Sequence, residues 1–385
     1  MRWSSTVSTT PDTEVALAEA CSAVHAQLDG AQADLVIAFV SPHHRQGWDV
    51  IAVDLTEAFP SATILACSAG GVIGGGREIE AAPGLSVVAA HLPDVRIHGF
   101  ALDDSEIPGP DTAAADWTER LRIDPAQDPV FVLLPDPFTC DGPRLLAGLD
   151  AAYPGQVKLG GLASGGQSPG AHRMLLDGQV RRSGMVGVAL VGDVEVDTVV
   201  ASGCRPVGPA MIVTAAQDNV LVSLDGLPAL SQLERIFSTA TEDERDRFQS
   251  GPMLGLAPSV GSTDYLVRNL TGMERAAGVL RVGAPLVVGQ EVRFHILDPA
   301  AARDSLDSRL RAQAEPAGAL LFSCLGRGAR FFGLPDHDTD LFHARVGGAP
   351  MGGFFCNGEI GPAHGRTWMH GYTSAFGLFR PRGWD

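Results

Sequence analysis

Near the carboxyl end of the chain, a glycine-rich stretch carries several side chains that could do chemistry. Cys356, Asn357 and Glu359 follow an apolar run, and His370 precedes a second one. Glycine and asparagine at this density predict a turn with special backbone angles. Cys356, His370 and Glu359 have the residue types of a thiol–imidazole–carboxylate set, in which an imidazolium would stabilise a thiolate. Their spacing is also compatible with ligand contact or with a structural network.

An earlier glycine turn follows the apolar run at 62–67 and contains Ser68, Gly70 and Gly71. Ser68 resembles the serine of a nucleophile elbow, but the first glycine of the Gly-x-Ser-x-Gly pattern is absent. The sequence assigns no aspartate and histidine to complete a triad. We therefore expect Ser68, Gly70 and Gly71 to contact a ligand rather than to catalyse.

Two arginines lie in turns bounded by glycine. Arg205 follows Cys204 in the segment 203–208, and Arg327 lies between two glycines. Either guanidinium could hold a carboxylate through two parallel hydrogen bonds, and a structural ion pair is the alternative. Cys204, Arg205 and Arg327 complete the set of expected ligand-binding residues.

Other polar motifs are weaker signals. Asp336, Asp338, Asp340 and His343 offer metal-type ligands without an established spacing, which favours a polar surface loop. The glycines before Arg77 lack the Lys-Ser/Thr of a phosphate-binding loop. We expect neither a metal nor a cofactor.

Composition limits the classes of partner. The 385 residues carry a net charge of −17, and 45% of them are apolar. This charge disfavours nucleic acid and anionic membranes, and no apolar run approaches the roughly 18 residues that span a bilayer. The six cysteines are scattered without a CxxC pair, which predicts thiols in a reducing cytoplasm.

The same order of predicted elements occurs three times along the chain. Each copy has an apolar strand, a helix, a second strand, a glycine turn and a returning strand. The first strands begin near residues 35, 130 and 318, and the turns lie at 68–76, 163–170 and 357–365. Strand–helix–strand steps predict parallel pairs, and the returning strands predict antiparallel ones. The fold class is therefore α/β with mixed α+β character, in which mixed sheets are covered by helices.

A fourth copy of this unit could begin near residue 219, although chance spacing is the alternative. We expect an N-terminal helix in residues 1–33 that packs on the first domain. Two domains would follow, at 34–225 and 226–385. A β-rich segment and a charged helical run at 241–247 lie between the clear copies.

The motifs resemble those of the FIST family, named for F-box and intracellular signal transduction proteins. Cys67-Ser-Ala-Gly-Gly-Val-Ile, Gly160-Gly-Leu-Ala-Ser-Gly-Gly and Ser202-Gly-Cys-Arg-Pro-Val-Gly-Pro209 resemble its N domain. Ser323-Cys-Leu-Gly-Arg-Gly328, Asn357-Gly-Glu-Ile-Gly-Pro362 and His370-Gly-Tyr-Thr373 resemble its C domain. The resemblance covers about residues 30 to 380 and is to the bacterial type without an F-box. It implies a sensory input protein that binds a small ligand such as an amino acid and signals to an output protein.

We therefore expect a cytoplasmic, non-catalytic sensory protein with its ligand among the glycine turns. Asn357, Glu359 and His370 would line a concave site, with Arg205 or Arg327 facing the opposite end of a zwitterion. An enzyme that uses Cys356 or Ser68 is the first alternative. A scaffold that binds another protein is the second.

Overall fold

The computed structural model describes residues 1–109, 114–249, 251–262 and 264–384. Its contacts divide the chain into two compact units. The first, which we call the three-sheet unit, contains residues 1–201, 306–369 and 373–385. The second, the barrel unit, contains residues 202–305 and 370–372. The boundary that we predict near residue 225 falls inside the barrel unit, and the predicted domain assignment stays a prediction.

The first repeat forms a mixed sheet around β2 (Leu35–Val40), whose six residues are all buried. A strand covered on both faces is apolar throughout, as β2 is. β3 (Thr63–Ser68) lies parallel to β2 on one side, and β6 (Leu85–His91) lies antiparallel on the other. The connecting helix α2 (Trp48–Ala58) ends shortly before Pro60, which cannot continue a helix.

The second and third repeats have the same strand order and directions. β8 (Val130–Pro135) pairs in parallel with β9 (Lys158–Gly161) and antiparallel with β12 (Met185–Gly192). β21 (Gly318–Cys324) pairs in the same way with β22 (Met351–Cys356) and β25 (Thr373–Arg380). The connections contain α4 (Gly142–Ala152) in the second repeat, and α8 (Ala329–Phe332) and α9 (His337–Val346) in the third. The shared topology predicted for these repeats is confirmed.

Each repeat also gives a β-hairpin to the sheet of another repeat. The hairpin of the first repeat, β4 (Gly71–Gly74) with β5 (Arg77–Ile79), pairs with β22. The hairpin of the second, β10 (Met174–Leu176) with β11 (Gln179–Arg181), pairs with β3. The hairpin of the third, β23 (Glu359–Ala363) with β24 (Arg366–His370), pairs with β9. The exchange is cyclic, so every sheet contains strands from two repeats.

One further strand completes the opposite edge of each sheet. These strands are β1 (Arg2–Ser8), β7 (Val95–Leu102) and β13 (Glu195–Ser202), and they bring each of the three sheets in the described residues to six strands. β1 is not predicted from the sequence. The predicted N-terminal helix is α1 (Thr13–Leu28), which is capped by the Asp12 side chain.

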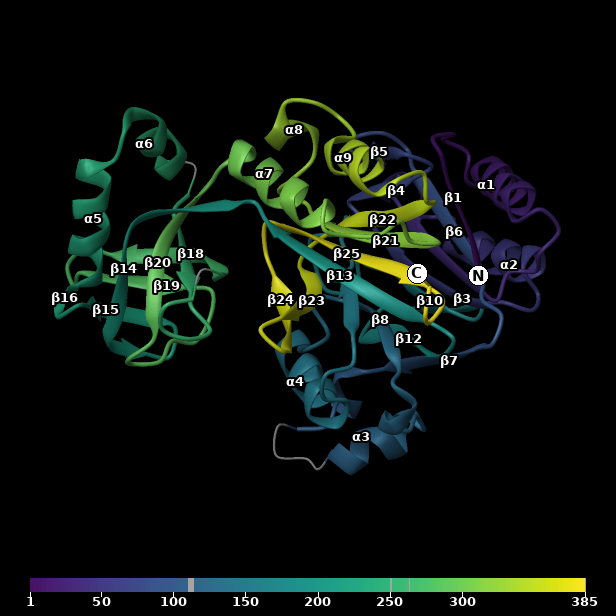
Figure 1. The fold of residues 1–385 in the computed structure, drawn as a ribbon, viewed down its shortest axis with the longest axis horizontal. Helices are drawn as coiled ribbons and strands as arrows, with labels where there is room; N and C mark the ends of the chain where they lie inside the picture. The colour runs from purple at the N-terminus through teal and green to yellow at the C-terminus, as the bar shows by residue number, and fades with distance from the viewer. Residues whose placement is uncertain (110–113, 250, 263, 385) are drawn as a thin grey trace. The chain divides into compact units, whose positions relative to one another are not determined.

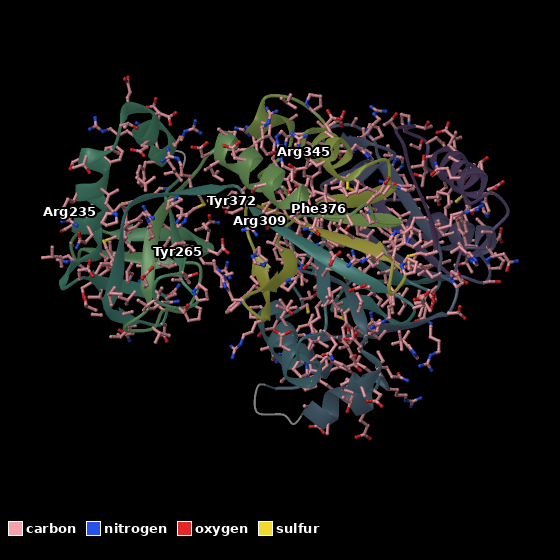
Figure 2. All side chains as sticks on the ribbon, in the orientation of Figure 1. Arg235, Tyr265, Arg309, Arg345, Tyr372 and Phe376 are labelled. Atoms are coloured by element: carbon pink, nitrogen blue, oxygen red, sulfur yellow. The ribbon has the colours of Figure 1, made fainter. Side chains whose placement is uncertain are left out.

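The three sheets share one apolar core and carry helices on their outer faces. Side chains from all three repeats meet in the shared core, including Phe39, Val132 and Phe322. The outer faces are covered by α1 and α2, by α3 (Ala114–Leu121) and α4, and by α7 (Pro299–Leu310) and α9 (Figure 1). Phe376 of β25 is labelled in Figure 2. Its ring stacks on that of Phe342 of α9, with centroids 5.8 Å apart.

The barrel unit is antiparallel throughout its described residues. Its strands follow the order β14, β20, β17, β18, β19, β15 and β16, and an additional β14–β15 pairing closes the sheet. Their bounds are Cys204–Gln217, Glu291–Leu297, Met253–Leu256, Leu266–Glu274, Val279–Val282, Val220–Leu224 and Leu227–Pro228. The unit also contains α5 (Ala229–Thr239) and α6 (Glu242–Gln249). The predicted fourth copy is therefore wrong, because β15 pairs antiparallel with β14, β16 and β19 and forms no parallel pair within the described part of the chain.

Candidate functional site

The turns that follow β3, β9 and β22 meet, one from each repeat. We call their segments 68–71, 162–166 and 356–358 the turn junction. The Ser164 amide donates to the Ser68 carbonyl (3.0 Å), and the Gly70 amide donates to Ser164 Oγ (2.7 Å). Ser164 Oγ in turn donates to the Phe355 carbonyl (2.5 Å). Ser164, which the sequence analysis does not single out, therefore links the three repeats.

Asn357 extends this contact and faces solvent. Its amide donates to the Leu162 carbonyl (3.1 Å), and the Leu162 amide donates to the Gly358 carbonyl (2.9 Å). The exposed side chain makes a long contact from Nδ2 to the Ala163 carbonyl (3.4 Å). Asn357 is thus the predicted site residue that is most open to a ligand.

Gly70 and Gly71 allow close packing of the junction. A Cβ at Gly70 would lie 2.4 Å from Leu325 Cδ2, and one at Gly71 would lie 2.9 Å from Phe355 Cδ2. Beside them, Ser68 Oγ accepts from the Arg173 amide (3.1 Å). The side chain of Leu325 is 42% exposed, so an apolar surface borders these polar groups.

Glu359 lies next to the junction but is completely enclosed, with 0% exposure. One carboxylate oxygen accepts from the amide (3.0 Å) and the hydroxyl (2.7 Å) of Thr373. The other lies 3.6 Å from Cys356 Sγ. Burial disfavours the charged form and raises the pKa of Glu359 to about 7, against the opposing effect of the hydrogen bonds. This carboxyl can therefore exchange a proton near neutral pH.

Cys356 shares the enclosure of Glu359. Its thiol is buried and lies 3.4 Å from the Ser323 carbonyl. Burial and the Glu359 charge raise the pKa of Cys356 well above its usual value, so the thiol is protonated at neutral pH. His370 is also buried, and it belongs to the barrel unit together with Cys204 and Arg205. The structure thus brings Cys356 and Glu359 together, and the complete thiol–imidazole–carboxylate set stays a prediction.

Arg327 is enclosed in the three-sheet unit and forms a bidentate pair with Asp338. The distances are 3.0 Å from Nε and 2.9 Å from Nη2 to the two carboxylate oxygens. Burial would raise the pKa of Asp338, but the Arg327 charge and several hydrogen bonds hold it well below its usual range. The guanidinium lies 5.0 Å from the ring centroid of Phe332, and its Nη1 has no hydrogen-bond partner among the described residues. The sequence motif around Asp338 suggests a metal ligand or a loop, whereas Asp338 is the partner of a buried arginine.

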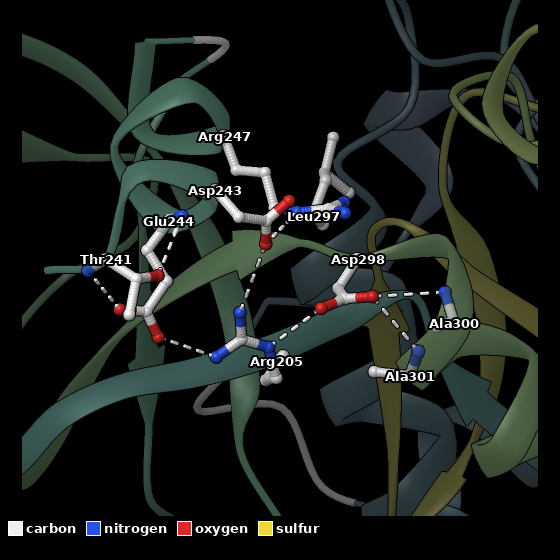
Figure 3. Close-up of polar contacts among 9 residues, drawn as sticks. All are labelled: Arg205, Thr241, Asp243, Glu244, Arg247, Leu297, Asp298, Ala300 and Ala301. Carbon is white, nitrogen blue, oxygen red and sulfur yellow. Dashed lines mark hydrogen bonds and ion pairs between the residues drawn. The ribbon is translucent and has the colours of Figure 1, made fainter.

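Arg205 occupies a different environment in the barrel unit (Figure 3). Its Nε donates to Asp298 (2.8 Å), and its Nη1 donates to Glu244 (2.9 Å). Asp298 also accepts from the amides of Ala300 and Ala301 at the start of α7. The guanidinium therefore links β14, α6 and the first turn of α7. Its two nearest partners are carboxylates of the protein itself.

A buried Asp136–His172 pair holds the glycine turn of the second repeat. His172 Nδ1 lies 2.8 Å from Asp136, and its Nε2 accepts from the Gly166 amide (3.0 Å). Because Nε2 is an acceptor, the ring proton must be on Nδ1. The ring of Phe138 stacks on the imidazole at 5.5 Å between centroids. This pair is not predicted from the sequence, although Asp136 directly follows the apolar run of β8.

Surface hollows occur elsewhere in the three-sheet unit. One of about 710 Å³ lies between residues 103–105 and 138–141, and one of about 610 Å³ lies between residues 11–13 and 42–47. The predicted ligand-binding residues line neither of them.

The part of the chain that the structure describes contains neither a metal-binding cluster nor a membrane-spanning helix. No group of three or more His, Cys, Asp or Glu side chains there is placed to hold a metal ion. No helix there is long and apolar enough to cross a membrane.

Comparison with known proteins finds matches over nearly the whole chain. Residues 34–227 match the FIST N domain, and residues 229–362 match the FIST C domain. An uncharacterized protein of Mycobacterium tuberculosis is 35% identical over 97% of this chain and 98% of its own length. One of Mycobacterium bovis is 33% identical over 97% of both. A cyanuric acid hydrolase from A. caulinodans aligns over 99% of this chain and 100% of its own, at 10% identity and a TM-score of 0.32. That score carries no argument about fold or function.

Proposed function

The chain belongs to the FIST family, whose domains are sensory domains of signal transduction, and on this premise we propose that it binds a small polar metabolite. The proposed site is the turn junction. The proposed role is non-catalytic, and the bound state would be read by an output protein.

The meeting of the three turns is the observation that carries this proposal. The junction gathers backbone groups from every repeat at the carboxyl ends of β3, β9 and β22. Ligands of α/β folds gather at such strand ends, where short loops can contact them. A molecule held there would touch segments from all three repeats, so its binding would favour one arrangement of them.

The exposed groups of the junction favour a ligand with both donors and acceptors. Asn357 offers an amide with both functions, and glycine backbone lies beside it. An amino acid or a related metabolite has this chemistry. Arg327 would grip its carboxylate only by exchanging the Asp338 carboxylate that it already contacts, and a role for Arg205 stays a prediction.

A thermal-shift screen against amino acids and polar metabolites tests the proposal. A ligand at 100 times its Kd should stabilise the protein by about 2.7 kcal/mol, which raises the Tm by several degrees. Asn357→Ala should abolish that shift while the Tm without ligand changes little. Asn269→Ala, an exposed asparagine of the barrel unit, is the matched control and should retain the shift.

The same samples separate the alternatives. If chromatography shows that the stabilising compound is consumed, the protein is an enzyme. If Asn357→Ala binds as the wild type does, the site lies elsewhere. If no compound shifts the Tm, the proposed ligand class is wrong.

A further inference from the structure

Two cysteines of the third repeat lie side by side at strand ends. Cys324 is the last residue of β21, Cys356 is the last residue of β22, and the two are register partners in a parallel pair. Register partners on parallel strands face the same side of the sheet, and neighbouring strands lie about 4.8 Å apart. This separation is inside the roughly 4.4–6.8 Å that a disulfide spans between Cα atoms.

The two thiols differ in access. Cys324 is half-buried and directly precedes the exposed residues Leu325 and Gly326, whereas Cys356 is completely buried. The Gly326 amide donates to Cys324 Sγ (3.5 Å) in the turn that follows β21. Cys324 can therefore meet a reagent from solution, and Cys356 can be reached only from within the protein.

One carboxyl lies against both thiols. Glu359 is in hydrogen-bond contact with Cys356 and with Cys324. The other groups that act on this carboxyl are the amide and hydroxyl of Thr373 and the nearby charge of Arg327. Gly161 packs directly over Cys356, where a Cβ would lie 2.9 Å from the sulfur, so the pocket around the buried thiol is tight.

We propose that Cys324, Cys356 and Glu359 form a thiol–disulfide exchange site that reacts with low-molecular-weight disulfides. The Cys324 thiolate attacks one sulfur of the disulfide. A mixed disulfide forms, and the first small thiolate leaves and takes up the proton released by Cys324. The Glu359 carboxylate then accepts the proton of Cys356. The Cys356 sulfur attacks Cys324 and displaces the second small thiolate, which is protonated in turn. The two protein thiols are oxidised to one disulfide, and the small disulfide is reduced to two thiols.

In this scheme Cys324 attacks the small disulfide, and Cys356 resolves the mixed disulfide with Glu359 as its base. The scheme explains why the carboxyl lies beside the buried thiol. A buried thiol needs a base before it can attack, and a carboxyl that titrates near neutral pH supplies one. The position at the strand ends also favours formation of the Cys324–Cys356 disulfide, because little of the β21–β22 ladder lies beyond the two cysteines and would have to shift. The inference is independent of metabolite binding at the turn junction, since the exchange needs only a disulfide.

Redox titration of the full-length protein tests the site directly. The reduced protein is incubated with mixtures of oxidised and reduced glutathione, its remaining thiols are alkylated, and its peptides are mapped by mass spectrometry. We expect a Cys324–Cys356 linked peptide in oxidising mixtures that disappears in reducing ones. A wild-type protein in which these two cysteines stay alkylated throughout would overturn the proposal.

Variants separate the two steps of the exchange. Cys356→Ser and Cys356→Ala should accumulate glutathione on Cys324, and Cys324→Ser should leave Cys356 reduced. Glu359→Gln should slow the conversion of the mixed disulfide to the Cys324–Cys356 disulfide by about tenfold or more, because the base is lost. Cys204→Ser, a half-buried cysteine of the barrel unit, is the matched control and should close at the wild-type rate. Closure of Glu359→Gln at the wild-type rate would overturn the role of Glu359.

Discussion

Two arginines that look alike in the sequence have very different surroundings. The Arg327 side chain is 1% exposed and holds a carboxylate in two parallel hydrogen bonds. The Arg205 side chain is 32% exposed and shares its donors between two carboxylates. Both turns contain glycine on either side, so the local sequence does not distinguish them. The difference is the exposure of each side chain to water, which can take the place of a lost partner.

The comparison shows what an ion pair does in each place. A buried pair gives little net stability over apolar groups, but a buried charge left without its partner is very costly. A pair in contact with water contributes little and is weakened by salt. We therefore expect the Arg327 cluster to fix one arrangement of the third repeat, and the Arg205 cluster to tie β14 to α6 and the start of α7.

The largest effect should follow the loss of one member of the buried pair. Arg327→Met should lower the free energy of unfolding by about 3–5 kcal/mol, because Asp338 would remain charged and enclosed. Urea denaturation measures this loss. Replacing both residues, as in Arg327→Met with Asp338→Leu, should recover much of it. A double variant as unstable as the single one would contradict this account of the buried pair.

The next effect is a pH dependence caused by Glu359. In the folded protein this carboxyl keeps its proton up to a pKa of about 7, whereas in the unfolded chain it loses the proton near its ordinary pKa of 4.5. The unfolded state therefore releases the proton first, and stability should fall as pH rises between these two values. The slope is about 1.4 kcal/mol per pH unit for one proton, and it levels off above the folded pKa.

Glu359→Gln should remove this contribution. Urea denaturation at several pH values should give a flatter profile for the variant than for the wild type between about pH 5 and pH 7. Glu78, whose pKa is raised to about 8 by burial and the Asp338 charge, remains in both proteins and contributes a slope of the same sign. Parallel profiles of wild type and variant would show that Glu359 is ionised in the folded protein.

A steric test concerns the enclosure around Cys356. Gly161→Ala places a methyl group against the cysteine side chain and should destabilise the protein by about 1–3 kcal/mol. Gly348→Ala is the matched control, because a Cβ there meets no atom within 4 Å. Equal melting temperatures for the two variants would mean that the residues around Cys356 accommodate the added methyl group without loss of stability, and would contradict tight packing there.

The smallest effect is expected at the exposed arginine. Arg205→Met should cost about 1 kcal/mol, since water can solvate Glu244 and Asp298 after the change. The cost measured by urea denaturation should shrink further as salt is raised. A loss as large as that of Arg327→Met, or one insensitive to salt, would remove the distinction between the two clusters.

The parts of the fold that follow from local sequence are predictable. β2 and β21 are continuous apolar runs, and Pro60 and Pro154 lie just beyond the ends of α2 and α4. These signals suffice for the order and directions of strands in the three repeats. They depend only on neighbours along the chain, which is why they can be read from it.

The exchanged hairpins and the charged partners could not be predicted. β4 is a short run with glycine at both ends, and its partner β22 is far away in the sequence. No local sequence motif predicts that Asp338 pairs with Arg327 or that His172 pairs with Asp136. Pairings of this kind depend on which segments tertiary packing brings together. The same reason explains why β15 and α5 resemble a further repeat but belong to an antiparallel barrel.

The cyclic exchange of hairpins has a consequence for dissection of the gene. β4 and β9 lie in the FIST N match, while their partners β22 and β23 lie in the FIST C match. A truncation between the two matches would leave β4, β9 and β13 without their partners β22, β23 and β25, and it would expose part of the shared core to water, which favours aggregation. The segments that match the two family domains therefore depend on each other to fold. We expect a fragment ending near residue 228 to form inclusion bodies when it is expressed.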